Sequence, residues 1–136
     1  MSTGGAAPAG LPSRRRLKTQ RQFRAVYQRG RRATGQWLTV VALPQRSRDG
    51  APATECRLGV SVSKDHGGAV RRNKLKRLLR EAFRLERAGL PGGIDLVLIP
   101  RQRAENFPLA ELRLELVAMV HKAMRQPEGA RGRRRP

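Results

Sequence analysis

The sequence predicts an α+β fold, a small α/β sandwich whose elements follow one another in the order α-β-β-α-β-α. Apolar residues recur at helical spacing in three segments, which is typical of amphipathic helices. Three shorter segments, alternating or almost continuously apolar, are typical of strands. Because the longest helix lies between the last two strands, we expect a sheet of three to four strands with a βαβ crossover through that helix.

The first helix is expected to begin at Thr19. Thr19 and Gln22 fit a capping box, in which each side chain satisfies an end amide of the helix. One apolar stripe follows at helical spacing, formed by Phe23, Val26 and Tyr27.

Two strands are expected next. Residues 37–43 are rich in β-branched side chains and end at Pro44. Residues 57–63 alternate, with Leu58, Val60 and Val62 on one face. The opposite face carries small and polar side chains, so another chain has room to lie close against it.

Residues 70–87 predict a helix with two very different faces. The apolar face is formed by Leu75, Leu78, Leu79, Ala82 and Phe83. The opposite stripe is formed by Asn73, Arg77, Arg80, Arg84 and Arg87, with Lys76 at its flank. Like charges so arranged repel one another, and only Glu81 and Glu86 interrupt the helix with negative charge. The stripe therefore predicts a binding partner that offsets the repulsion.

Asn73 has two readings of equal weight. Its amide donates and accepts, so it can read a sugar hydroxyl or a base edge. Near a helix start, an asparagine also commonly bonds the local backbone.

A buried strand and a helix complete the expected fold. Residues 94–99 form a nearly continuous apolar run, which is typical of a central strand. Asn106 is expected to cap the last helix, with Pro108 in its first turn. The apolar stripe of that helix is formed by Leu109, Leu112, Leu116, Val120 and Ala123.

The charge points to a polyanionic partner. The chain has 136 residues, 30 of them Lys or Arg against 10 Asp or Glu, for a net charge of +20. Nucleic acid is the simplest partner, because neutralised phosphates release counterions; an acidic membrane or protein is an alternative. Residues 1–13 and 125–136 read as disordered tails around a domain at 14–124. The single Cys56, and the absence of a signal peptide or membrane span in the sequence, favour a cytoplasmic protein.

Residues for bond-breaking chemistry are not evident. His66 and His121 lack metal-ligand spacing, and nothing in the spacing supports a carboxylate pair of Asp65 and Asp95. We therefore expect no catalytic residue and no metal site in this chain.

Residues 58–85, LGVSVSKDHGGAVRRNKLKRLLREAFRL, resemble the signature of the bacterial ribonuclease P protein subunit. The family's box of Arg-Asn-Arg, a basic pair and a further Arg reads here Arg72-Asn73-Lys74, Lys76-Arg77 and Arg80. The flanking segments RLKTQRQFRAVYQRG and IDLVLIPR resemble the family's first helix and last strand. The resemblance covers about residues 14–124.

The resemblance implies an endoribonuclease holoenzyme in which an RNA subunit is the catalyst. That RNA would remove the 5′ leader of precursor tRNA with Mg²⁺ held mainly by RNA, and the protein needs no protein partner. The catalytic RNA would contact Arg71, Arg72, Asn73, Lys74, Lys76, Arg77, Arg80 and Arg84. The single-stranded leader would contact Phe23, Tyr27, Trp37, Ser61 and Lys64, although Trp37, Phe23 and Tyr27 also suit the core.

Two positions depart from the family pattern. Lys74 stands where the box has Arg, which removes a bidentate fork, and Asp65 stands where many members carry Lys. The alternatives are a ribosomal or ribosome-assembly protein, a DNA-binding protein and a self-sufficient nuclease. A strand and a glycine turn before the basic helix disfavour a helix-turn-helix DNA binder.

Overall fold

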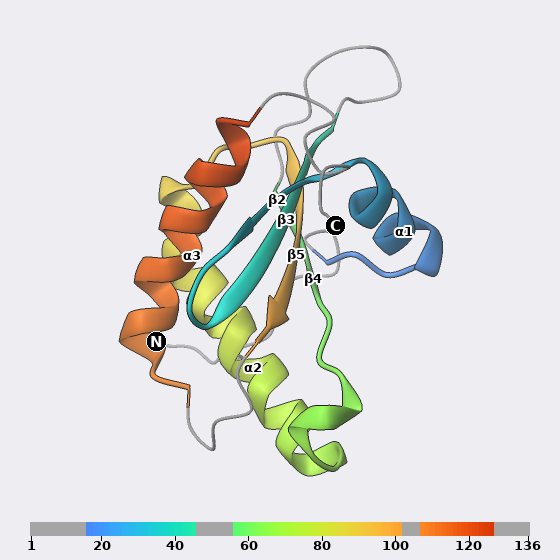
Figure 1. Cartoon of the computed structure of the whole chain (residues 1–136), viewed down its shortest axis with the longest axis vertical. Coiled ribbons are helices and arrows are strands. Elements are labelled where there is room, and N and C mark those ends of the chain that lie inside the picture. Colours follow the sequence, from blue (N-terminus) through green and yellow to red (C-terminus); the bar gives the residue numbers. More distant parts are fainter. Residues whose placement is uncertain (1–15, 46–55, 102–106, 127–136) are drawn as a thin grey trace, which may run out of the picture.

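A four-stranded mixed sheet separates one helix from two others in the computed structural model (Figure 1). The structure describes residues 16–45, 56–101 and 107–126. The strands lie in the order β2-β3-β5-β4. The elements are α1 (Gln20–Arg29), β2 (Arg31–Thr34), β3 (Leu38–Pro44), β4 (Arg57–Val60), the 3₁₀ turn η2 (Lys64–His66), α2 (Ala69–Glu86), the 3₁₀ turn η3 (Arg87–Gly89), β5 (Ile94–Pro100) and α3 (Leu109–Met124).

The predicted fold class and the crossover are confirmed. β4 pairs with β5 in parallel, and α2 connects them, as expected for a βαβ unit. β3 pairs with β5 antiparallel, which puts β5 at the centre of the sheet between β3 and β4. The predicted element order lacks one strand, β2, which forms an antiparallel hairpin with β3.

The capping box of α1 is confirmed. The Thr19 hydroxyl accepts from the Gln22 amide at 3.1 Å, and the Gln22 side chain accepts from the Thr19 amide at 3.2 Å. The Gly30 amide then donates to the Val26 carbonyl at 2.8 Å and ends the helix. A Cβ on Gly30 would lie 2.7 Å from the Val41 side chain, so glycine allows the end of α1 to sit directly on β3.

Both faces of the sheet are buried because the strand residues alternate between two apolar clusters. Val40 and Leu98 face α2 and α3 in the larger cluster. Val41 and Val97 face α1 in the smaller cluster, together with Leu17. This double burial explains why residues 94–99 read as a continuous apolar run.

Several predicted boundaries shift by a few residues. The strand expected at 37–43 spans Leu38–Pro44, and the one expected at 57–63 ends at Val60. Pro108 is the N-cap of α3 instead of a residue of its first turn, and Asn106 lies outside the described residues. The expected tail 1–13 also lies outside them, as does most of 125–136. No helix in the described part of the chain is long and apolar enough to cross a membrane.

Candidate nucleic-acid interface

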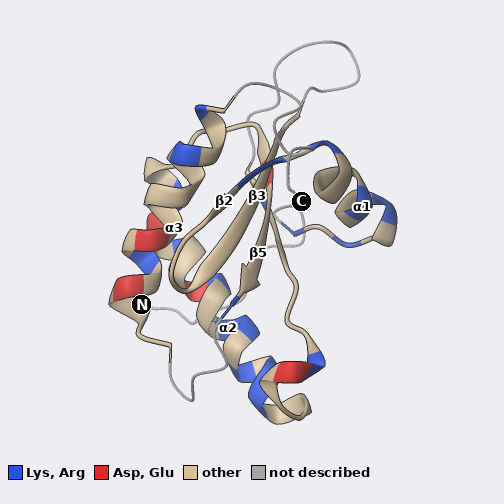
Figure 2. Ribbon diagram, in the orientation of Figure 1, with Lys and Arg blue, Asp and Glu red and all other residues tan. Residues whose placement is uncertain are grey.

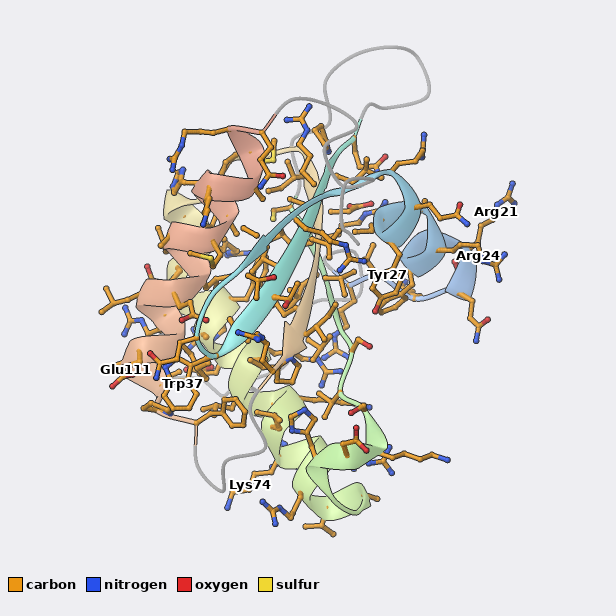
Figure 3. All side chains as sticks on the ribbon, viewed as in Figure 1. Arg21, Arg24, Tyr27, Trp37, Lys74 and Glu111 are labelled. Atoms are coloured by element: carbon orange, nitrogen blue, oxygen red, sulfur yellow. The ribbon has the colours of Figure 1, made fainter. Side chains whose placement is uncertain are left out.

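Lys and Arg residues recur along α2 (Figure 2). Its inward face buries Leu75, Leu79, Ala82 and Phe83, which fixes the rotation of the helix. Figure 3 shows Lys74 projecting from its exposed N-terminal half. The exposed members of the predicted set are Arg71, Asn73, Lys74, Arg77 and Arg84, and the half-buried members are Arg72, Lys76 and Arg80. All eight predicted residues lie on α2, and together they are called here the α2 surface.

A glycine turn sets the start of the α2 surface. Gly67 has φ 116°, a left-handed conformation that L side chains rarely adopt. Its carbonyl accepts from the Arg72 Nε at 3.2 Å, which orients that guanidinium. Within the part of the chain that the structure describes, the exposed Asn73 side chain has no hydrogen bond, so its amide stays open to a partner.

Arg84 is already engaged within its own helix. Its guanidinium donates two hydrogen bonds to Glu81, at 3.0 and 2.7 Å. The hydrogen bond from Arg84 lowers the pKa of Glu81, and the same contact raises the pKa of Arg84. Arg84 is therefore the least available of the predicted cations, although the exposed pair costs little to break.

The pKa of Arg80 is shifted in the opposite direction to that of Arg84. Burial lowers the pKa of its guanidinium, and the positive charges of Arg16 and then Arg77 lower it further. Arg16 was not among the predicted site residues. Its proximity to α2 depends on an isolated parallel bridge between Arg16 and Leu58, a long-range contact that no local pattern announces.

A pocket of about 470 Å³ lies on the other side of the sheet edge, against α1. Phe23 and Tyr27 stand one helical turn apart, with ring centroids 6.5 Å from each other. The residues that line it are Lys18, Gln20, Phe23, Arg24, Tyr27 and Ser61, and it is called here the α1 pocket. Figure 3 shows Arg24 and Tyr27 on the same helix, with Arg21 beside them.

The floor of the α1 pocket depends on Gly59. A Cβ on Gly59 would lie 2.6 Å from the Phe23 ring, closer than any side chain tolerates. Gly59 therefore leaves room on the face of residues 57–63 that was expected to carry small side chains, and the Phe23 ring packs into part of that room. Phe23 and Tyr27 are half-buried against the smaller cluster, so each contributes to both the core and the pocket.

The structure brings only some of the predicted leader residues together. Phe23, Tyr27 and Ser61 line the pocket, whereas Lys64 lies exposed in η2 and is not part of the lining. Trp37 lies on the opposite face of the sheet. Its indole donates to Glu111 at 3.0 Å, and its ring packs 5.5 Å from Phe107 (Figure 3). Trp37 precedes β3 and turns toward α3, so the core reading is the one that its placement supports.

Three lining residues were missed by sequence reasoning. Gln20 and Arg24 lie one turn apart on the exposed side of α1, and Lys18 precedes the helix. The available signal was their spacing beside Phe23 and Tyr27, which puts polar groups on the rim of an aromatic pair.

The described residues hold no group of three or more His, Cys, Asp or Glu side chains able to bind a metal ion. Asp95 is 2% exposed and accepts from Arg57 at 2.9 and 2.8 Å and from Gln45 at 2.7 Å. That hydrogen bonding raises the pKa of Arg57. Asp95 is therefore a structural anchor and is not paired with Asp65. The His66 Nε2 lies 3.2 Å from the Pro100 carbonyl.

Comparison with known proteins gives a consistent match. A family model described as Ribonuclease P matches residues 11–124. The chain is 35% identical over 122 residues to the ribonuclease P protein component of Desulfovibrio desulfuricans, covering 88% of this chain and 91% of that protein. It is 44% identical over 90 residues to the protein of the same name from Oleidesulfovibrio alaskensis, covering 66% and 69%.

Solved structures give the same result for the fold. The RNase P protein from Thermotoga maritima superposes with a TM-score of 0.67 at 29% identity, covering 79% of this chain and 96% of that one. The Staphylococcus aureus RNase P protein superposes with a TM-score of 0.64 at 30% identity, covering 80% and 96%.

Proposed function

The chain belongs to the ribonuclease P protein family, and from this premise we propose that its two surfaces bind two different RNA segments. As a protein component of ribonuclease P, it is part of an endoribonuclease of tRNA processing and associates with the RNase P RNA. We propose that the α2 surface binds the catalytic RNA and that the α1 pocket binds the single-stranded 5′ leader of precursor tRNA. The observation that carries the proposal is the cationic face of α2, opposed within the described part of that helix by only Glu81 and Glu86.

The chemistry of the α2 surface suits a structured RNA. Arginine binds phosphate with a planar fork of paired donors, and each neutralised phosphate releases counterions. The open amide of Asn73 adds a group that both donates and accepts. Glu86 is held by Arg113 of α3, so it is drawn toward the domain and away from this surface.

The chemistry of the α1 pocket suits an unpaired strand. Bases stack on aromatic rings, and Lys18 and Arg24 supply cations for the backbone phosphates. Ser61 and Gln20 add hydrogen-bonding groups without bulk. A double helix would not expose base faces to Phe23 and Tyr27, which supports a single-stranded ligand.

We further propose that the RNA subunit supplies catalysis and holds the Mg²⁺ that the holoenzyme requires. The described residues do not offer a donor set that fits a divalent cation, since their carboxylates are dispersed. No step of the proposed mechanism therefore passes through a metal ion on this chain; its residues bind and orient RNA. No observation favours the ribosomal alternative.

The test is stimulation of cleavage. Purified full-length protein is added to a bacterial ribonuclease P RNA at low Mg²⁺, and removal of the leader from precursor tRNA is followed by gel. We expect the protein to raise the cleavage rate, with a larger effect on a substrate with a long leader than on one with a single leader nucleotide. No stimulation would refute the proposal, and cleavage by the protein alone would indicate an active site in this chain.

A further inference from the structure

Arg16 lies between the α2 surface and the α1 pocket, the two surfaces proposed to bind RNA. It forms an isolated parallel bridge with Leu58, and the next amide, that of Leu17, donates to the Leu58 carbonyl at 2.9 Å. This short segment extends the sheet past β4, on the way into α1 (Figure 1). Leu17 is buried in the cluster under α1. Because side chains alternate along extended backbone, Arg16 points to the other face, toward α2.

On that face Arg16 lies near Arg80, which is about one helical turn from Arg77 on α2. The charges of Arg16 and Arg77 both act on Arg80, which is itself half-buried. The Arg16 Nε is buried and has no hydrogen-bond partner among the residues that the structure describes. A buried donor without an acceptor is costly, and so is a cluster of like charges.

Five of the six carboxylates among the described residues have partners elsewhere. Within residues 16–45, 56–101 and 107–126, Asp65 is exposed in η2 and every other carboxylate already has a partner. Those engaged carboxylates are Glu81 with Arg84, Glu86 with Arg113, Asp95 with Arg57, Glu111 with Trp37, and Glu115 with the backbone at Gln36–Leu38. No described carboxylate neutralises the arginine cluster, which leaves it complementary to an external anion.

We propose that Arg16, Arg77 and Arg80 form one binding site for a phosphate group of an RNA backbone. The site joins the α2 surface to the α1 pocket, since Lys18, two residues after Arg16, lines that pocket. Arg16 thereby fixes where an RNA strand passes from one surface to the other. The RNA part of this inference rests on the proposed function, whereas the anion site itself does not.

The first arm of the test uses inorganic phosphate and the full-length protein. Thermal unfolding is followed in sodium chloride and in sodium phosphate at equal ionic strength. Arg16→Met removes the unpaired donor and the repulsion on Arg80, so we expect its Tm in chloride to exceed that of the wild type by about 4 °C. Phosphate should raise the wild-type Tm, and Arg16→Met should lose most of that rise.

Two further variants serve as controls for the thermal unfolding experiment. Lys122→Met removes one exposed charge from the far end of α3 and should keep the full response to phosphate. Arg16→Lys keeps the charge without the guanidinium fork and should show a smaller rise than the wild type. An equal response in the wild type and in Arg16→Met overturns the anion site.

The second arm uses RNA. For binding to ribonuclease P RNA, Arg16→Met should reduce the log–log salt slope by about one unit, and Lys122→Met should leave it unchanged. The same comparison is then made for precursor tRNA bound to the assembled holoenzyme. If the salt slope falls for only one of the two RNAs, that RNA supplies the phosphate that Arg16 binds. If Arg16→Met leaves the salt slopes for both RNAs unchanged but loses the rise of Tm in phosphate, the site binds an anion that is not RNA, and RNA is overturned as the ligand. The proposed function is judged separately, by the stimulation of cleavage.

Discussion

At the residue scale, Gly59 shapes the α1 pocket through its close approach to the Phe23 ring. Replacing it by alanine places a Cβ 2.6 Å from the Phe23 ring, so the ring and α1 must move. We expect Gly59→Ala to weaken binding of a single-stranded leader by about 1–3 kcal/mol, the range for one stacked base. Fluorescence anisotropy with a labelled leader oligonucleotide and the assembled holoenzyme measures this change.

Gly89→Ala is the matched control for Gly59→Ala. A Cβ on Gly89 meets nothing within 4 Å, so the same chemical change leaves α1 in place. Equal leader affinity in Gly59→Ala and Gly89→Ala would show that Phe23 does not contact the leader.

At the element scale, one side chain of α3 holds the β2–β3 hairpin. The Glu115 carboxylate accepts from the amides of Gln36, Trp37 and Leu38 at 3.0, 2.6 and 2.6 Å. Glu115→Gln removes the charge and turns one acceptor into a donor. We expect the free energy of unfolding to fall by about 1–3 kcal/mol, and hydrogen exchange to accelerate first at the amides of Trp37 and Leu38.

Glu111→Gln serves as the comparison for the hairpin. Glu111 is exposed and accepts only from the Trp37 indole among its described contacts, so its loss should cost less. Slow, unchanged exchange at Trp37 and Leu38 in Glu115→Gln would mean that the strand pairing alone holds the turn.

The α2 surface also gives a prediction at the element scale. Arg77→Ala combined with Arg80→Ala should flatten the salt dependence of RNA binding by about one log–log unit per lost phosphate contact. Filter binding to ribonuclease P RNA over a range of salt measures the slope. The double variant Lys122→Ala and Arg125→Ala removes the same charge from the end of α3 and should leave the slope close to the wild type. Equal slopes in the two double variants would place the contact surface elsewhere.

Most helices and strands were predictable from the local spacing of apolar residues. The features that the sequence did not predict, β2 and the position of Arg16, depend on pairing between distant parts of the chain. The helix of residues 70–87 was predictable because its apolar and cationic positions separate at 3.6 residues per turn. β2 was not, because Arg31 and Arg32 occupy half of a four-residue strand that forms only by pairing with β3. Arg16 was missed for the same reason, since its place depends on Leu58, far along the chain. The departures at Lys74 and Asp65 leave the fold unchanged, as both side chains are exposed.

At the scale of the whole molecule, self-repulsion should make the free protein respond to salt in the opposite sense to its complex. The net charge is +20, and the described carboxylates are mostly held in internal contacts. Screening relieves repulsion in the compact state more than in the unfolded chain. We therefore expect the Tm of the free protein to rise between about 20 and 200 mM sodium chloride, while RNA affinity falls over the same range. Calorimetry and filter binding in matched buffers measure both; a falling Tm would show that internal ion pairs outweigh the repulsion.

The central position of β5 has a consequence for how the molecule is made. β3 and β4 are not neighbours, and each pairs with β5 instead. A chain that grows from its N-terminus therefore produces the β2–β3 hairpin, β4 and the whole of α2 before the strand that joins them exists. Until Ile94–Pro100 and then α3 emerge, α2 presents its cations while its apolar face still lacks the β5 and α3 residues that share its buried cluster. Sheet closure is thus a single late event in synthesis, and the growing chain is able to attract RNA before it is able to fold.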